Sequence, residues 1–404
     1  MKEERIIFHI DVNNAFLSWT AVDMLRRGAT EDIRNIPSVI GGDEDARRGI
    51  VVAKSPVAKK YGVKTAETLY QARRKCPGLK VFPANHELYK RESDKLYQYY
   101  LQFTPTVERF SVDECFLDMT GTHYLYDDLI RLAYQMKDEI HEKFGITVNV
   151  GIANNRLCAK MASDFEKPNK VHTLFASEVE EKMWPLDVGD LLFIGKRSAE
   201  TLKALGIHTI GELAKTDVSL LTKYFKSNAI YMHNASLGID DTPVTSERAE
   251  RKSISTTATL PFDVTVKSYI RKMLLSQADE VGLEAREKKL YATSIAIIIR
   301  TDAFVNYSHQ CKLENPTNVS EDIFKKAYAL FERAWKGEPI RLIGIRLGNF
   351  IKTNMTQISL FDTDTVDDGS SKVQEAVDQI RSKFGKDIIM PASLKEEGSD
   401  RDGK

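Results

Sequence analysis

The sequence predicts an α+β protein built from several domains. The chain has 404 residues, which leaves room for two to four domains with substantial cores. Short apolar runs of strand length alternate with segments of helical periodicity. A charged stretch at 246–253 separates a long first part from a shorter second part, and each part has its own strands and helices.

In the first part, Ile6–Ile10 is expected to form a buried strand, and Val107–Met119 two strands joined by a tight turn. The stretch from about residue 26 to 83 is basic and rich in loop residues. Helices are expected near 89–103, 124–144 and up to 164, with a strand at 146–152. These elements predict a sheet covered by helices, followed by short helices at 170–240.

In the second part, the same criteria predict strands at 255–260, 291–301, 306–313 and 341–350. Helices are expected at 267–289 and 321–335. Residues 371–384 also have helical spacing, and we expect this segment to dock on the body or on a partner.

Three acids suggest the chemistry of the first part. Asp11 ends the first apolar strand, and Asp113 and Glu114 lie between the two strands of the later pair. An acid at the end of a buried strand is costly unless a cation lies beside it, and Mg²⁺ prefers oxygen ligands. Two such ions suit phosphoryl or nucleotidyl transfer. In the alternative, Asp113 and Glu114 only occupy a turn and Asp11 caps a helix that starts near Asn13.

Four segments carry a resemblance to Y-family DNA polymerases of the bacterial DNA polymerase IV (DinB-like) type. They are His9–Phe16, Ser111–Asp118, Gly151–Asn155 and the stretch 159–169, in the family's order and spacing. The match extends over roughly residues 5 to 361. The resemblance implies that Asp11, Asp113, Glu114 and the Val12 carbonyl bind two Mg²⁺ ions, with Mn²⁺ as a possible substitute. It also implies that Phe16 is the steric gate that excludes a ribose 2'-hydroxyl.

The resemblance also implies a domain order. The palm, with a ferredoxin-like sheet, would comprise residues 1–25 and 84–168, and the fingers 26–83. The thumb, with a helix-hairpin-helix near 194–207, would comprise 169–245, and an α+β little finger 246–352. A C-terminal tail at 353–404 would carry a motif for binding a sliding clamp, with Gln357, Leu360 and Phe361 as its contacts.

Residues for substrate binding are carried over in the same way. The nucleotide would be bound by residues that flank the first strand, lie in the fingers or follow the palm: Asn14, Ala15, Phe16, Lys54, Ser55, Lys59 and Lys167. The DNA would be bound by Gly195, Lys196, Arg300, Lys312 and Arg346. The fingers depart from the family pattern, because its usual tyrosine is Pro56 and its usual arginine is Lys59. The usual first glycine of the hairpin is Phe193.

The activity implied is template-directed addition of deoxynucleoside triphosphates to a primer, with low-fidelity synthesis past damaged bases. Its partners would be primer-template DNA and a sliding clamp. The alternative is a catalytically weak DNA-binding scaffold that keeps the polymerase fold. Gly41–Glu44 also mimics the start of a diguanylate cyclase signature, but Asp45 follows where that class has an aromatic residue.

Composition fits an intracellular enzyme. The 58 basic and 58 acidic residues give a net charge of zero, so any DNA surface must be a local basic patch. No stretch reaches membrane-spanning length, and we expect a cytoplasmic monomer. The four cysteines are widely separated and lack Cys-x-x-Cys spacing, which indicates reduced structural thiols.

Overall fold

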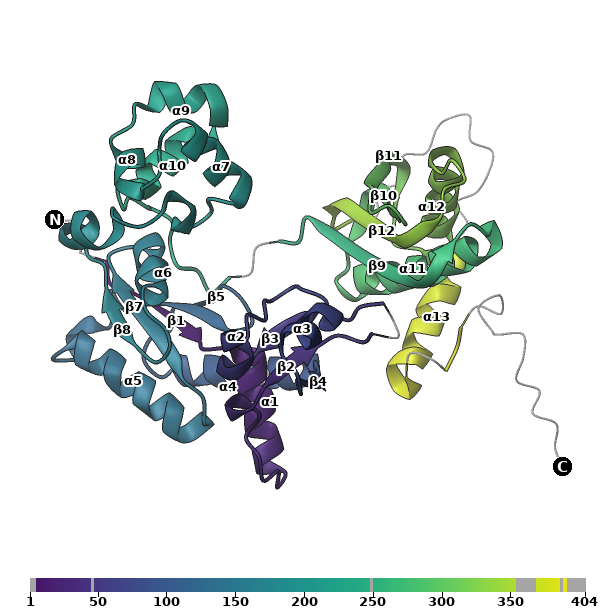
Figure 1. Ribbon diagram of the computed structural model, residues 1–404. Coiled ribbons are helices and arrows are strands. Elements are labelled where there is room, and N and C mark those ends of the chain that lie inside the picture. Colours follow the sequence, from purple (N-terminus) through teal and green to yellow (C-terminus); the bar gives the residue numbers. More distant parts are fainter. Residues whose placement is uncertain (1–4, 45–46, 248–249, 354–367, 386–387, 391–404) are drawn as a thin grey trace. The chain divides into compact units, whose positions relative to one another are not determined.

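The structure is a computed structural model that describes residues 5–44, 47–247, 250–353, 368–385 and 388–390 (Figure 1). The chain divides into two units. The first comprises Met1–Asp43 and Gly49–Arg248, and the second comprises Glu44–Arg48 and Ala249–Lys404. The predicted mixture of strands and helices in both parts of the chain is confirmed.

A five-stranded sheet lies at the centre of the first unit. Its order is β5 (Val107–Arg109), β6 (Glu114–Asp118), β1 (Ile7–Val12), β7 (Val148–Ala153) and β8 (Val171–Thr173). Strand β1 pairs antiparallel with both β6 and β7, and all of its residues are buried. A central strand covered on both faces explains why the sequence reads as a continuous apolar run.

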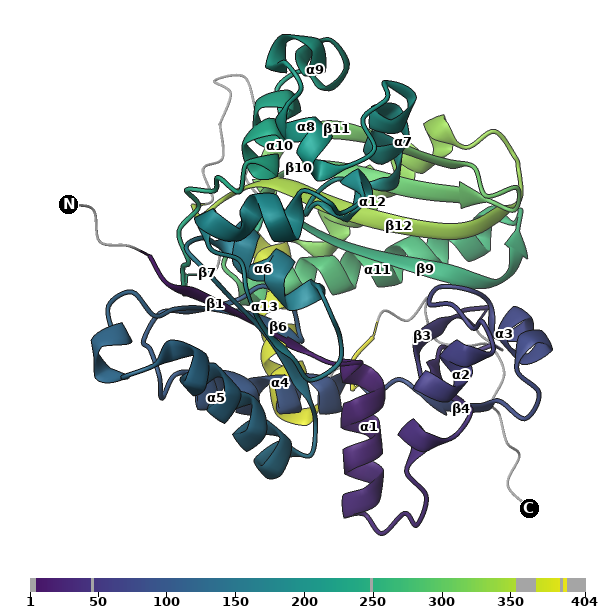
Figure 2. The same ribbon diagram turned by 60° about the vertical axis from the view of Figure 1, so that its left-hand side comes forward.

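Helices cover both faces of this sheet (Figure 2). Helices α4 (His86–Tyr100) and α5 (Leu129–Phe144) share one core with Phe8 and Ile10 of β1. Helix α6 (Arg156–Asp164) packs in another core, with Ile7. Because side chains alternate along a strand, Asp11 lies on the same face as Ile7, which is the face of α6.

The expected fingers region contains more regular structure than the sequence predicts. After α1 (Ala15–Arg26) and the turn η1 (Ile33–Asn35), strands β3 (Val51–Lys54), β2 (Ser38–Gly41) and β4 (Lys80–Pro83) form a sheet in that order. Helices α2 (Pro56–Lys60) and α3 (Leu69–Lys75) pack on it. Each strand has only four residues, which is too short to produce a clear alternation.

Short helices follow, as predicted for 170–240. They are α7 (Lys196–Ala204), α8 (Ile210–Ala214), α9 (Val218–Phe225) and α10 (Asn228–Ser236). Brief helical turns accompany them along the first unit: η2 (His123–Leu125), η3 (Ala176–Glu178), η4 (Val179–Met183) and η5 (Val188–Asp190). Strand β8 pairs in parallel with β7 and so belongs to the five-stranded sheet, whereas the sequence analysis placed its residues after the expected boundary at 168.

The second unit has a four-stranded antiparallel sheet in the order β11-β10-β12-β9. The strands are β9 (Ser253–Val264), β10 (Tyr291–Thr301), β11 (Asn306–Thr317) and β12 (Ile340–Ile351). Helices α11 (Lys267–Glu287) and α12 (Ser320–Ala334) pack against one face, where Ile295, Ile297 and Ile345 are buried. The predicted strands and helices are all present, although β9 and β11 are longer than expected.

The last helix, α13 (Asp368–Phe384), docks on the second unit. Arg286 of α11 donates to both carboxylate oxygens of Asp378, and Arg381 lies 2.7 Å from Asp279 of α11. Both arginines are largely buried. The sequence left open whether this helix docks on the body of the chain or on a partner. The structure shows it against α11, which belongs to the body of the chain.

Candidate active site

The strand register brings the three acids together at one end of the palm sheet. Asp11 of β1 lies directly opposite Glu114 of β6, so their side chains are neighbours on one face. The Val12 amide donates to the Asp113 carbonyl at 3.0 Å. Glu114 opens strand β6, whereas the sequence reading placed it in the turn with Asp113. The Asp11 residue is only 6% exposed, so its carboxylate requires a cation nearby.

Two lysines, Lys160 and Lys167, supply that positive charge. Their contacts with the acids were not predicted from the sequence. The Lys160 ammonium contacts Glu114 and lies 3.6 Å from Asp11 and 3.3 Å from Asp164. The Lys167 ammonium lies 2.5 Å from Asp11 and 2.8 Å from Asp164. Lys160, Asp164 and Lys167 are spaced i, i+4 and i+7, a pattern that places side chains on one side of a helix and its extension. That spacing was a usable sequence signal.

The electrostatics of this cluster follow from burial. Burial raises the pKa of Glu114, and the charges of Asp11 and Asp113 act in the same direction. Burial alone would lower the pKa of Lys160, but the hydrogen bond to Glu114 and the nearby acids outweigh it and raise that pKa. The Lys160 side chain therefore remains a charged ammonium that partly neutralises the acids.

Within the described part of the chain, no group of three or more acids, histidines or cysteines is arranged to hold a metal ion. The ammonium groups of Lys160 and Lys167 contact the carboxylates that an ion would need. The donor set itself fits hard divalent ions, since it consists of carboxylate oxygens and the Val12 carbonyl. A lysine side chain is long and rotatable, so it can leave a carboxylate without movement of the backbone.

A buried histidine fixes the sheet against α6 below the acids. His9 is fully buried, its Nδ1 lies 2.8 Å from the Ser163 hydroxyl, and its ring packs on Phe116 at 4.6 Å. Burial lowers the pKa of His9, and the charges of Lys160, Lys167 and Arg156 lower it further. The imidazole is therefore neutral and supports the neighbouring Asp11 without adding charge.

The Phe16 ring is held by packing. It stacks on Tyr89 of α4 with a centroid distance of 4.5 Å and an interplanar angle of 24°. The Tyr89 hydroxyl lies 3.0 Å from that of Thr20, and Thr20 also donates to the Phe16 carbonyl. A ring held in this way can exclude an atom by contact, as a steric gate requires.

The fingers residues are an exposed cation, a half-buried cation and a buried hydroxyl, which belong to Lys59, Lys54 and Ser55. Lys59 is exposed on α2, and Lys54 donates to Thr65 at 3.0 Å. The Asn14 amide donates to the Lys54 carbonyl at 2.8 Å, which ties the fingers to the start of α1. Ser55 was expected to contact nucleotide, but it is fully buried.

The Ser55 hydroxyl caps helix α2 by accepting from the Ala58 amide, and it donates to the Ile36 carbonyl. A serine before Pro at the first helical position is a common way to begin a helix. The Ser55 side chain is therefore not available to contact a nucleotide, contrary to the expectation from the sequence. Ala15 is also buried, so only its backbone is available to a ligand.

The thumb residues surround the start of α7. Gly195 is the N-cap of α7 and has no side-chain cap, and Lys196 beside it is 90% exposed on its side chain. Open amides at this helix end suit a phosphate. Phe193 takes a left-handed backbone conformation, with φ of 68°.

The three cations expected in the little finger share one face of its sheet. On β10, Ser294, Ala296 and Arg300 lie at even spacing and so share one face. Lys312 of β11 lies opposite Ser294, and Arg346 of β12 lies opposite Ala296. The isoleucines that pack on α11 and α12 alternate with these positions, so the cations lie on the other face. Arg300 also donates to Asn306 at 2.7 Å. The arrangement suits contact with a phosphate backbone.

The predicted clamp contacts Gln357, Leu360 and Phe361 lie outside the described residues. In the part of the chain that the structure describes, no helix is long and apolar enough to span a membrane.

Comparisons with known proteins agree with this arrangement. The model of the impB/mucB/samB family matches residues 10–164, that of its C-terminal domain matches 251–360, and that of the family's HHH motif matches 176–207. The DNA polymerase IV of Clostridium acetobutylicum is 44% identical over 97% of this chain and 98% of its own length. DNA polymerase IV 1 of Bacillus subtilis is 34% identical over 99% of this chain and 96% of its own length.

A solved structure supports the same assignment. The Y-family DNA polymerase chimera Dbh-Dpo4(243-245)-Dbh matches with a TM-score of 0.75 and 25% identity. The match covers 86% of this chain and 100% of that one. The helix-hairpin-helix and the α+β fold inferred from the sequence are therefore confirmed. This chain belongs to the impB/mucB/samB family of Y-family DNA polymerases and is a DNA-directed DNA polymerase.

Proposed function

We propose that this polymerase extends a DNA primer by two-metal catalysis and carries out low-fidelity synthesis past damaged template bases. The observation that carries the catalytic part is the cross-strand pairing of Asp11 with Glu114, beside Asp113. The damage-tolerance part rests on the likeness to DNA polymerase IV.

The acids would divide between two ion sites. Asp11, Asp113 and Glu114 would hold an ion near the primer hydroxyl, and Asp11, Asp113 and the Val12 carbonyl would hold another near the triphosphate. Mg²⁺, or Mn²⁺ in its place, would promote loss of the hydroxyl proton and neutralise charge on the leaving pyrophosphate. The rigid pairing of β1 and β6 would fix the spacing of these ligands.

The lysines would exchange partners when substrate binds. Lys167 lies between Asp11 and Asp164, so it is within side-chain reach of a triphosphate bound at Asp11. Asp164 contacts both Lys160 and Lys167, and it would retain the ammonium groups as they leave Asp11 and Glu114. Lys54 and Lys59 would add positive charge from the fingers, near the backbone of Asn14 and Ala15. Phe16 would exclude ribonucleotides by contact with the 2'-hydroxyl.

DNA would be held at two places by contacts that do not read sequence. The Gly195 and Lys196 end of α7 suits one strand, and the face with Arg300, Lys312 and Arg346 suits phosphates of the duplex. Residues 357–361 would dock Leu360 and Phe361 in a pocket of the sliding clamp, with Gln357 hydrogen bonding beside it.

Primer extension tests the main proposal. The full chain should add deoxynucleotides to a primer on undamaged and lesion-bearing templates with Mg²⁺ or Mn²⁺, and EDTA should stop the reaction. Binding of the primer-template without extension under any of these conditions would instead support the scaffold alternative.

A deletion tests the clamp proposal separately. Removal of residues 357–361 should abolish stimulation by the clamp and leave distributive synthesis unchanged, since none of the proposed DNA contacts belongs to these residues. Equal stimulation with and without the motif would refute clamp docking.

A further inference from the structure

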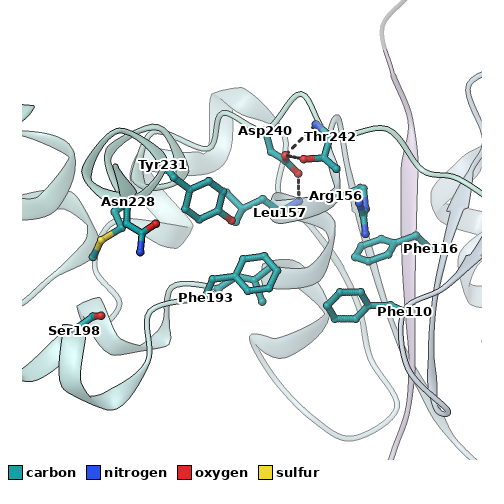
Figure 3. A pocket seen from close by; sticks show the side chains of 12 residues that line it. Phe110, Phe116, Arg156, Leu157, Phe193, Ser198, Asn228, Tyr231, Asp240 and Thr242 are labelled. Carbon is teal, nitrogen blue, oxygen red and sulfur yellow. Dashed lines mark hydrogen bonds between the residues drawn. The ribbon is translucent and has the colours of Figure 1, made fainter. Parts of the chain in front are cut away.

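A pocket of about 420 Å³ lies between β6 and α6 of the palm and the short helices α7 and α10 of the thumb (Figure 3). Its volume is in the range of small-molecule sites. The aromatic rings of Phe110, Phe116, Phe193 and Tyr231 line it. The Phe193 and Tyr231 centroids are 6.0 Å apart, and Figure 3 shows Phe193 with Tyr231 on one side and Phe110 on the other. Such walls suit a flat, aromatic ligand.

Phe193 is unusual in two respects. Its backbone φ of 68° is in a region that glycine adopts freely and that a bulky residue rarely adopts. Its residue surface is 67% exposed, so burial of its own ring does not compensate for this conformation. Phe304 of the second unit shares this conformation and exposure, so the strain alone assigns no role to Phe193. What distinguishes Phe193 is its ring, which lines the pocket and which a glycine would lack.

The polar groups of the pocket are suited to a neutral ligand. Among the described residues, the side chains of Ser198, Asn228 and Tyr231 have no hydrogen-bond partner, and all three line the pocket. Both charged side chains of the pocket are already engaged. Asp240 accepts from the Leu157 amide and from Thr242 (Figure 3), and Arg156 pairs with Glu108 at 2.6 Å. A flat ring with donors and acceptors on its edge, such as a nucleobase, matches these walls and groups.

The place of the pocket identifies which base. Phe110 directly precedes the Ser111–Glu114 segment, and Phe116 lies two residues after Glu114 on β6, so chain neighbours of the acids at which a primer 3' end would react line the pocket. Lys196, at the start of α7, provides an exposed cation for a backbone phosphate three residues from Phe193. A paired terminal base is held in the duplex by hydrogen bonds to the template base and by stacking on the preceding base pair, so an unpaired base leaves the duplex and enters the pocket more readily.

We propose that this pocket binds an unpaired 3'-terminal base of the primer, stacked on Phe193 and Tyr231. Capture there withdraws a mismatched primer end from the catalytic acids and slows its extension. The inference rests on the proposed polymerase function, because the chain must first hold a primer-template.

The probe is a primer-template with 2-aminopurine at the primer 3' end, either paired with thymine or mismatched with guanine. Without nucleotide, the wild-type chain should quench the mismatched probe and bind it more tightly than Phe193→Gly does, by about fivefold or more. Tyr231→Leu should lose the same preference. Phe193→Gly should also extend the mismatched primer faster, while both variants bind the paired primer as the wild type does.

Phe304→Gly is a matched control for Phe193→Gly. Phe304 is 60% exposed with φ of 60° and does not line the pocket, so its replacement should leave both duplexes unaffected. Unchanged quenching and affinity for the mismatched probe in Phe193→Gly would overturn the inference while the polymerase function stands. An equal loss for paired and mismatched primers would also overturn it, because Phe193 would then be a general DNA contact. Failure of the wild type to bind either duplex would overturn both proposals.

Discussion

The acids of the palm and the cations of the fingers differ in burial and in the elements that hold them. Asp11 and Glu114 are fixed by paired strands, and two lysines neutralise them within the fold. Lys54 and Lys59 lie on a short strand and a short helix, and Lys59 is exposed. In the proposed mechanism, paired and buried strands would therefore position the chemistry, whereas less buried side chains would contact the triphosphate. We expect damage to the palm to lower turnover and damage to the fingers to raise the KM for nucleotide.

The largest effect is expected at the acids. Asp113→Ala or Glu114→Ala should lower the rate of nucleotide addition about a thousandfold or more, because each removes a ligand for transition-state charge. Primer-template binding should change little, since phosphate contacts elsewhere dominate it. Single-turnover extension and fluorescence anisotropy measure the two quantities. Near-normal extension by either variant would contradict the expectation that damage to the palm lowers turnover.

The steric gate should have a smaller but selective effect. Phe16→Ala should raise ribonucleotide incorporation relative to deoxynucleotide incorporation by about a hundredfold, since it removes the contact that blocks a 2'-hydroxyl. Ratios of kcat/KM for the two sugars measure this. Tyr70→Ala, at an exposed aromatic residue of the fingers, is the control that should leave the ratio unchanged. A constant ratio in Phe16→Ala would refute the gate.

Thiol reactivity compares the rigidity of the two regions. Burial raises the pKa of Cys115 and that of Cys158 to about 12 in the palm, and it also raises that of Cys76 in the fingers. The thiolate is the reactive form, so little reacts at pH 8 unless the region opens. The fingers core is smaller, so Cys76 should be alkylated about tenfold faster than Cys115. Peptide mass spectrometry resolves the sites, and equal rates would indicate equally rigid regions.

The smallest effect is expected at Lys59. Lys59→Ala should raise the KM for the incoming nucleotide about three- to fivefold, as a partly solvated phosphate contact is lost. Lys59→Arg should hold or lower the KM, because guanidinium can bind phosphate in a bidentate manner. The neighbouring exposed Lys60→Ala is the control. Steady-state kinetics with an unaltered KM in Lys59→Ala would make that lysine a solvated charge.

The sequence predicts the acids and the strands better than the partners of those acids. Asp11 lies at the end of one apolar run and Glu114 at the start of another, so the two acids meet once these strands pair antiparallel. Lys160 was missed, because its spacing to Asp164 and Lys167 places three charged side chains together but does not show that Lys160 contacts Glu114, 46 residues away. Ser55 was assigned to nucleotide binding, although its position before Pro56 also matches a helix cap, and only the fold shows that its hydroxyl is buried.

Metal binding by the ternary complex tests the central claim most directly. The chain, a primer-template with a chain-terminated primer and the matching deoxynucleoside triphosphate form a complex that cannot react, and electron paramagnetic resonance counts its bound Mn²⁺. We expect two ions per chain in the wild type and in Asp138→Ala, whose carboxylate lies on the exposed side of α5. We expect Asp113→Ala to bind fewer. An Asp113→Ala complex that still binds two ions with wild-type affinity would contradict the assignment of the palm acids.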